Sequence, residues 1–332
     1  MRLYKFITDW ILIFAILGGI AGYFAYTSIP ALDGTHQTAL EIVQTVQPLL
    51  IFGMLFLTFC KVNLNELRLR RYHWWLLLFQ VGIYLALGAL TLIIPHGSAR
   101  IVTEGAMICF ICPTATAGAV IVKKLGGSAI NIATYTILIN LAVSLVIPAT
   151  IPLVHPNPQM SMWNASVLIL GKVFPLLLFP LLSAYLLRQF LPRFHHYVQQ
   201  YGHLSFQLWV VALALATAVT TRYIVHSDVS VSTDLWLVAV SLVACLLQFY
   251  IGRRIGAIYG DKITAGQSLG QKNTVLAIWM GYTFFTPITS VAGGFYSIWH
   301  NVINSWQLYN HKKKSAECDK HARLEHAPAH LN

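Results

Sequence analysis

The stretches Cys112-Pro113-Thr114-Ala115-Thr116-Ala117-Gly118 and Gly266-Gln267-Ser268-Leu269-Gly270-Gln271-Lys272-Asn273 interrupt two otherwise apolar segments. In a bilayer every backbone N–H and C=O needs a partner, so non-helical backbone survives there only where it is buried in protein or lines a cavity. Interrupted apolar segments at corresponding positions in two halves of a chain indicate the binding site of a secondary transporter. The pair therefore favours transport over catalysis.

The composition is that of a multi-pass membrane protein. Of the 332 residues, 57% are hydrophobic and 10% are charged, whereas soluble domains carry about 25% charged residues. The net charge of +11 would suggest nucleic acid in a soluble protein, but here it must be read loop by loop, and no nucleic-acid partner is expected. The odd number of cysteines implies no disulfide framework. The run from Trp10 to about Ile29 is long enough to span, which favours a retained helix over a signal peptide.

Ten apolar segments of about 20 residues can be placed along the chain. They cover residues 8–29, 41–60, 74–94, 101–121, 128–154, 165–187, 205–225, 233–251, 265–286 and 288–309. The two interrupted stretches fall in the fourth and ninth. Five spans therefore lie in residues 1–154 and five in 155–310. Because five is odd, the second half must be inverted relative to the first.

The basic residues support this count. With a cytoplasmic N-terminus, the lysines and arginines fall on the inner side with four exceptions, which are Arg100, Lys172, Arg222 and Lys272. Positive residues concentrate in cytoplasmic loops, so we expect a cell-membrane protein with both termini cytoplasmic. The charged, His-rich tail of residues 311–332 is expected to be disordered and solvated rather than metal-binding.

Lys272 is the most unusual side chain, because an unpaired ammonium at the bilayer centre costs at least about 2.5–3.5 kcal/mol. It is expected to face a cavity or a partner; the alternative is that it reaches the cytoplasmic surface. For Lys172, reaching the outer surface is favoured. Excess positive charge without deep carboxylates suggests an anionic ligand. Since burial disfavours a charged ammonium, proton coupling through Lys272 is also open.

Other polar residues lie within the apolar segments. Thr114 and Thr116 add hydroxyls beside the backbone freed at Pro113, for which a simple proline kink is the alternative. His300 and Asn301 either line a cavity or pack between helices, and Gln80 could join helices. For Cys109-x-x-Cys112 apolar packing is favoured over metal binding. The sequence contains no catalytic Ser/His/Asp set, no HExxH motif and no phosphate loop, so neither a metal nor a cofactor is expected.

The chain resembles the bile acid:sodium symporter family over residues 11–309, including arsenite- and pantoate-carrier relatives. The stretch from Cys112 to Ala117 is similar to the family's Pro-Gly-Gly-Thr-Ala. The second stretch, Gly270-x-x-Asn273-x-x-Leu276-Ala277, is similar to its Gly-x-Gln-Asn-x-x-Leu-Ala. Trp299-His300-Asn301 matches its Trp-His-Asn, and Gln80 matches a glutamine of its third span.

The resemblance implies a fold and a site. Spans one, two, six and seven would form a panel domain, and spans three to five and eight to ten a core domain, in which the broken fourth and ninth spans cross. Substrate would bind near that crossing. The implied substrate residues are Thr114, Thr116, Asn273, His300 and Asn301.

Departures from the family pattern affect the sodium sites. Ser268 replaces a glutamate, Lys272 replaces a glutamine, and Gly118-Ala119 replaces Ser-Asn; a serine of span five is Ile132 here, although a threonine remains at Thr136. Two unit charges 4 Å apart repel by about 4 kcal/mol at an effective dielectric of 20. We therefore expect Lys272 to take the place of a sodium ion, held by Ser268, Gln80 and carbonyls. The ion site or its replacement would comprise Gln80, Thr136, Ser268, Gln271 and Lys272.

The sequence thus predicts a sodium-independent carrier for an organic anion, either bile-acid-like or a small carboxylate, working by alternating access. The alternatives are a sodium-coupled symporter of the same family and a sensor that keeps the fold without transport. A membrane-embedded enzyme would need a nucleophile with a base, or a metal cluster, and only isolated candidates such as Cys112 and His300 are present.

Overall fold

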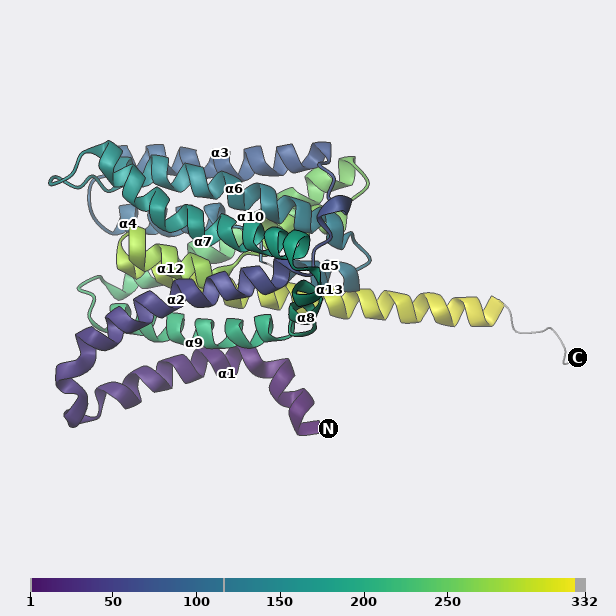
Figure 1. Ribbon diagram of the computed structural model, residues 1–332, viewed down its shortest axis with the longest axis horizontal. Helices are drawn as coiled ribbons and strands as arrows, with labels where there is room; N and C mark the ends of the chain where they lie inside the picture. The colour runs from purple at the N-terminus through teal and green to yellow at the C-terminus, as the bar shows by residue number, and fades with distance from the viewer. Residues whose placement is uncertain (1, 116, 326–332) are drawn as a thin grey trace, which may run out of the picture.

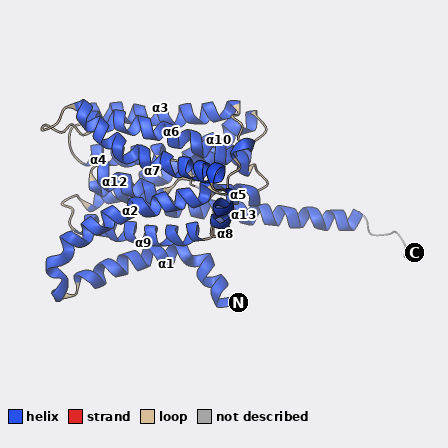
Figure 2. Ribbon diagram, in the orientation of Figure 1, coloured by secondary structure: helices blue, strands red, loops and turns tan. Residues whose placement is uncertain are grey.

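The computed structural model describes residues 2–115 and 117–325, which form helices joined by short loops (Figures 1 and 2). The α-helices are α1 (Arg2–Thr27), α2 (His36–Phe59), α3 (Arg71–Ile93), α4 (Ser98–Ile111), α5 (Gly118–Lys124), α6 (Ala129–Val154), α7 (Met162–Phe190), α8 (Pro192–Gln200), α9 (Leu204–Val225), α10 (Val231–Ile258), α11 (Lys262–Gly270), α12 (Thr274–Phe284) and α13 (Ser290–Glu325). Three short 3₁₀ helices are η1 (Pro30–Thr35), η2 (Leu64–Glu66) and η3 (Pro287–Thr289).

Six helical segments of the described chain are long and apolar enough to cross a membrane. They are Pro30–Phe59, Arg71–Ile93, Ala129–Val154, Met162–Phe190, Leu204–Val225 and Val231–Ile258, and two shorter apolar segments are Ile11–Thr27 and Thr274–Phe284. Large apolar side chains such as Ile93, Trp163 and Val231 are 74–80% exposed. Such an apolar exterior suits contact with lipid. The prediction of an all-α membrane protein is confirmed at this level.

Both interrupted stretches break their helices, as predicted. The chain leaves helical geometry between Ile111 and Gly118 and again between Gly270 and Thr274. Cys112 has ψ 131°, because the residue before a proline is disfavoured in the helical region. The second break is shorter than its polar stretch, since residues 266–270 still belong to α11.

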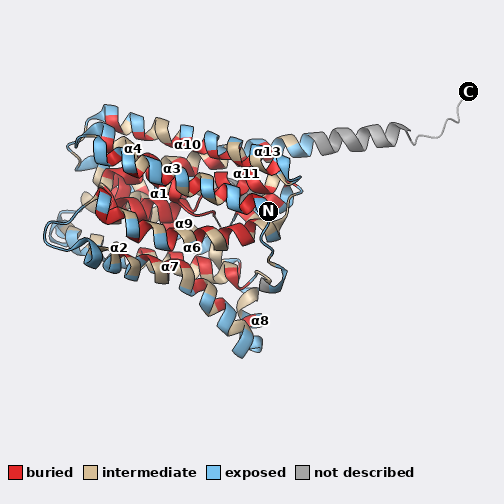
Figure 3. Ribbon diagram, turned by 90° about the horizontal axis from the view of Figure 1, so that it is seen from above, coloured by how far each residue is buried: buried red, intermediate tan, exposed pale blue. Residues whose placement is uncertain are grey.

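The broken helices lie inside the bundle. α10 packs along α11, α6 along α7, and α1 and α2 both pack against α9. Buried residues concentrate in the middle of the bundle (Figure 3), and α12 is buried from Thr274 to Tyr282. A helix buried on every side must have its ends satisfied by protein groups, which sets the chemistry of the breaks.

Two segments outside the predicted spans are helical. The connection 188–203 contains α8, which begins at Pro192, a favoured residue for the first helical position. α13 continues to Glu325 and extends beyond the bundle (Figure 1), so the prediction of disorder is wrong for residues 311–325. The Lys, Ala, Glu, Arg and Leu residues of this segment favour helix, which composition alone concealed. Residues 326–332 lie outside the described part.

The close packing of α10 on α11 depends on Gly252. A Cβ atom there would lie 2.5 Å from the Ala265 carbonyl oxygen and 2.9 Å from the Gly266 Cα. We expect Gly252→Ala to force the helices apart and to cost at least about 1–3 kcal/mol. Thermal unfolding in detergent would measure this loss. Gly82→Ala is the matched control, because a Cβ at Gly82 meets nothing within 4 Å; equal unfolding temperatures for the two variants would contradict the prediction.

Candidate functional site

The two breaks lie side by side and pair with each other. Thr114 and Lys272 form an isolated antiparallel β-bridge. The Ala115 N–H donates to the Gln271 carbonyl, and the Asn273 N–H donates to the Pro113 carbonyl, both at 2.9 Å. Each break thus supplies partners for backbone groups that the other leaves without helical ones, which removes a cost of several kcal/mol per group in an apolar medium. The expectation that the breaks meet is confirmed, and we call residues 112–115 with 271–273 the crossing.

Side chains of the breaks add further bonds. The Thr114 hydroxyl donates to the Ser268 carbonyl at 2.6 Å, and the Cys112 thiol donates to the Asn273 carbonyl at 2.9 Å. The Asn273 side-chain oxygen accepts from the Leu276 N–H at 3.3 Å and so caps α12. Thr114 and Asn273 are therefore part of the crossing, and their role in binding substrate stays a prediction. Thr116 lies outside the described residues.

Four successive carbonyls at the end of α4 accept hydrogen bonds from side chains of other segments. The donor and acceptor pairs are Gln248 and Cys109 (3.1 Å), Lys272 and Phe110 (3.2 Å), Gln80 and Ile111 (3.2 Å), and Gln80 and Cys112 (3.0 Å). The last carbonyls of a helix have no partner within it and form the negative end of its dipole. Two amides and one ammonium therefore complete α4 inside the bundle.

Lys272 is buried, with 1% of its surface exposed. Its Nζ donates to the Phe110 carbonyl, and no carboxylate among the described residues lies within 4 Å of it. The alternative that it reaches the cytoplasmic surface is therefore wrong. The residues predicted to hold the ammonium are only partly right. A carbonyl binds it, as predicted, but Gln80 donates to other carbonyls and the Ser268 hydroxyl has no partner among the described residues. Lys172, in contrast, is exposed on α7.

Gln80 links three segments. Besides its two bonds to α4, its side-chain oxygen accepts from the Tyr135 hydroxyl of α6 at 2.9 Å. Thr136 is buried but donates to the Ile132 carbonyl of its own helix at 2.8 Å, so it does not join this network. Gln271 is 4% exposed and its side-chain oxygen has no partner among the described residues. The structure thus brings Gln80 and Lys272 together at the end of α4 and leaves Thr136 apart.

His300 and Asn301 lie on α13 outside the crossing. The His300 ring packs edge-on against Tyr296, with centroids 5.8 Å apart. Tyr296 reaches the crossing region, since its hydroxyl donates to the Gly270 carbonyl at 2.8 Å. Asn301 donates to the Ser297 carbonyl of its own helix at 2.7 Å. Neither residue bonds directly to the crossing. His300 is linked to it only through Tyr296.

Three residues of the network were missed from the sequence: Tyr135, Gln248 and Tyr296. Gln248 donates to Cys109, to Ala244 and to the Tyr296 hydroxyl. A glutamine within an apolar span is a signal in itself, and it is the same signal that identified Gln80. The tyrosines carried no comparable signal, because tyrosine is common among the apolar residues of membrane helices.

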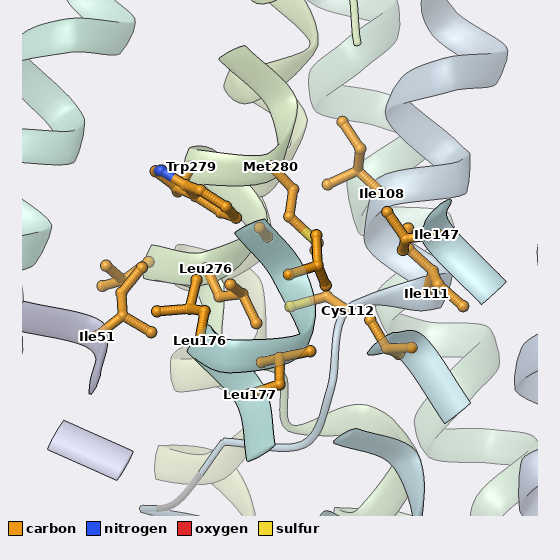
Figure 4. Close-up of a cluster of buried hydrophobic side chains, with 14 of the residues drawn as sticks. Ile51, Ile108, Ile111, Cys112, Ile147, Leu176, Leu177, Leu276, Trp279 and Met280 are labelled. Carbon is orange, nitrogen blue, oxygen red and sulfur yellow. The ribbon is translucent and has the colours of Figure 1, made fainter. Parts of the chain in front are cut away.

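An apolar cluster covers the crossing. Figure 4 shows Cys112 close to side chains from α4, α7 and α12. Ile51 of α2 and Leu177 of α7 belong to the same cluster as Leu276 of α12, and all three are at most 1% exposed. The crossing is therefore closed off from solvent in this conformation on the side of α2 and α7.

Glu104 is a buried charge that lies away from the crossing. Glu104, which is 1% exposed, is 3.4 Å from Arg100 and 3.2 Å from His155, and it accepts from the Thr286 N–H at 3.1 Å. These contacts join the start of α4, the end of α6 and the loop before η3. Glu104 thus has partners of its own and does not pair with Lys272.

The likeness to the bile acid:sodium symporter family rests on the four short motifs around Gln80, Thr114, Asn273 and His300. The structure brings the first three together within one hydrogen-bonded network. Comparison of the chain with protein-family models and with curated protein sequences found no match.

Proposed function

We propose that the protein is a secondary carrier for an organic anion, built from ten spans in two inverted five-helix repeats and working by alternating access. The observation that carries the proposal is the pairing of two broken helices inside an apolar bundle, with a buried lysine at their contact that has no carboxylate partner in the described part of the chain. Broken helices are tolerated at such depth where a substrate or ion is handled. A purely structural bundle would need neither break.

The charge at the crossing favours an anion. Lys272 has no carboxylate partner among the described residues. A buried ammonium suits a carboxylate or sulfonate group, since hydrogen bonds between charged partners are the strong ones. The proposed substrate class is therefore a bile-acid-like amphiphile or a small carboxylate.

Lys272 also supports independence from sodium. Its ammonium is bound by the carbonyl of Phe110 at the negative end of α4, and carbonyl oxygens are the ligands that a sodium ion would use. A second cation beside it would meet direct repulsion. We propose that the ammonium is a built-in cation, so that the carrier is either a facilitator or coupled to protons through Lys272.

Movement would occur between two domains. The proposed panel is α1, α2, α7 and α9, and the proposed core is the remaining spanning helices. Ile51 and Leu177 of this panel belong to the same buried apolar cluster as Leu276 of the core. Alternating access requires this apolar contact to open and to form again on the other side, by rocking of one domain against the other.

The test is saturable counterflow of labelled organic anions in proteoliposomes containing the full chain. We expect uptake that responds to the anion gradient and, in the proton-coupled form, to a pH gradient, but not to an inward sodium gradient. Sodium-driven uptake with stoichiometric sodium binding would establish the sodium symporter instead. Specific anion binding without counterflow would indicate a sensor on this fold.

A further inference from the structure

A groove lies between α1, α2 and α9, away from the crossing. α1 and α2 both pack against α9 (Figure 1), and the space between them has a volume of about 580 Å³. This lies within the range of about 300–1,000 Å³ that small-molecule sites occupy. Its lining is mostly apolar along α1, α2 and α9, with residues such as Ile11, Leu40, Ala214 and Ala218.

Three glycines of α1 shape this groove. A Cβ at Gly19 would lie 2.4 Å from the Ala214 carbonyl oxygen, so Gly19 lets α1 approach α9 closely. Gly18 and Gly22 also line the groove, but a Cβ at either position would meet nothing within 4 Å. These two residues, one helical turn apart, therefore leave open space that the packing of α1 on α9 does not require.

The polar lining gathers at helix ends. Arg222 is in the last turn of α9, Tyr26 in the last turn of α1, and His36 opens α2. No carboxylate among the described residues pairs with Arg222, and His36 Nε2 is buried without a hydrogen-bond partner. The first-turn N–H groups of α2 have no side-chain cap. Helix ends with tyrosine and arginine lie at the level of lipid headgroups in membrane proteins.

We propose that this groove binds one anionic phospholipid, with its phosphate on Arg222 and an acyl chain along Gly18 and Gly22. The apolar walls match a hydrocarbon chain, and the cationic end complements a phosphate, which arginine binds in a bidentate manner. The bilayer supplies this ligand directly. The site does not involve Lys272, so the inference is independent of the proposed transport function.

Native mass spectrometry of the full chain in detergent tests the site, with phosphatidylglycerol and phosphatidylcholine as probes. We expect one phosphatidylglycerol to bind at least about tenfold more tightly than phosphatidylcholine, because a bond to a charged group contributes about 1.5–3 kcal/mol. Arg222→Gln is expected to reduce this preference to near parity, whereas Lys172→Gln, which removes an exposed lysine of α7, leaves it unchanged.

The acyl-chain position is tested by filling the groove. Gly18→Leu/Gly22→Leu places side chains in the open space and is expected to abolish binding of the tight phosphatidylglycerol, whereas Gly82→Leu adds a leucine to open surface on α3 and is the matched control. Equal binding of both lipids by the parent protein, or retention of the tight lipid by the double leucine variant, would overturn the proposal. The proposal would also be overturned if the parent protein were a dimer and the double leucine variant a monomer, because a second copy would then occupy the groove.

Discussion

Lys272→Met is expected to lower anion transport by at least about tenfold while leaving the fold at least as stable as the parent. Transport falls because the substrate anion loses its interaction with the buried charge, and such an interaction contributes about 1.5–3 kcal/mol. Methionine keeps an unbranched side chain, one heavy atom shorter than that of lysine, but removes the positive charge from the crossing.

The effect on stability follows from two opposing terms. Removing a buried, unpaired ammonium relieves a cost of at least about 2.5–3.5 kcal/mol. Leaving the Phe110 carbonyl without its donor costs about 1–3 kcal/mol. The first term is the larger, so the free energy of unfolding should stay the same or rise. A residue kept at the expense of stability is expected at a functional site.

Thermal unfolding in detergent and anion counterflow measure the two quantities separately. Lys172→Met is the matched control, because Lys172 is exposed on α7, and neither quantity should change there. A fall in the unfolding temperature of Lys272→Met with transport retained would mean that Lys272 is only a cap for α4.

Gln80→Leu is expected to destabilise the protein by at least about 3 kcal/mol. The change removes the donor to the Ile111 and Cys112 carbonyls and the acceptor of the Tyr135 hydroxyl. All of these groups are buried, and each costs about 1–3 kcal/mol when left without a partner. Leucine is similar in size to glutamine, so lost hydrogen bonds rather than lost volume dominate the change.

A double-mutant cycle with Tyr135→Phe isolates one of these bonds. Tyr135→Phe alone leaves the Gln80 oxygen without its partner, whereas in the Gln80→Leu background it removes a hydroxyl that is already unpaired. We expect a coupling energy of about 0.5–3 kcal/mol from thermal unfolding. Gln37→Leu is the control, because Gln37 is exposed. A cost for Gln80→Leu no greater than for Gln37→Leu would show that the network does not stabilise the crossing.

The positions of the helix breaks were predicted correctly from the sequence, whereas the helical conformation of the tail was not. Pro113 and the polar run ending at Asn273 are local signals, and local geometry follows from them. The predicted disorder after His311 failed because charge content, taken alone, does not distinguish a helix such as the end of α13 from a coil. The boundaries of the second break were also too wide, since Gly266 and Gly270 are tolerated in α11.

The partners of the site residues could not be predicted in the same way. Lys272 was expected to be held by Ser268, Gln80 and carbonyls, and the carbonyl that accepts from it is that of Phe110, 162 positions away. Gln248 meets Cys109 across 139 positions. Such pairs depend on which helices pack together and in what rotation, which periodicity along a single chain does not encode.

The sequence by itself determined that this is an all-helical membrane protein with two broken segments, because apolar length and interrupted backbone are properties of short stretches. Its resemblance to the bile acid:sodium symporter family stays a prediction. Only the tertiary structure decided that the breaks pair with each other and that Lys272 completes the end of α4. It also decided that α1, α2 and α9 leave a groove. The physical reason is that a buried polar group takes whichever partner the packed helices bring within hydrogen-bond distance.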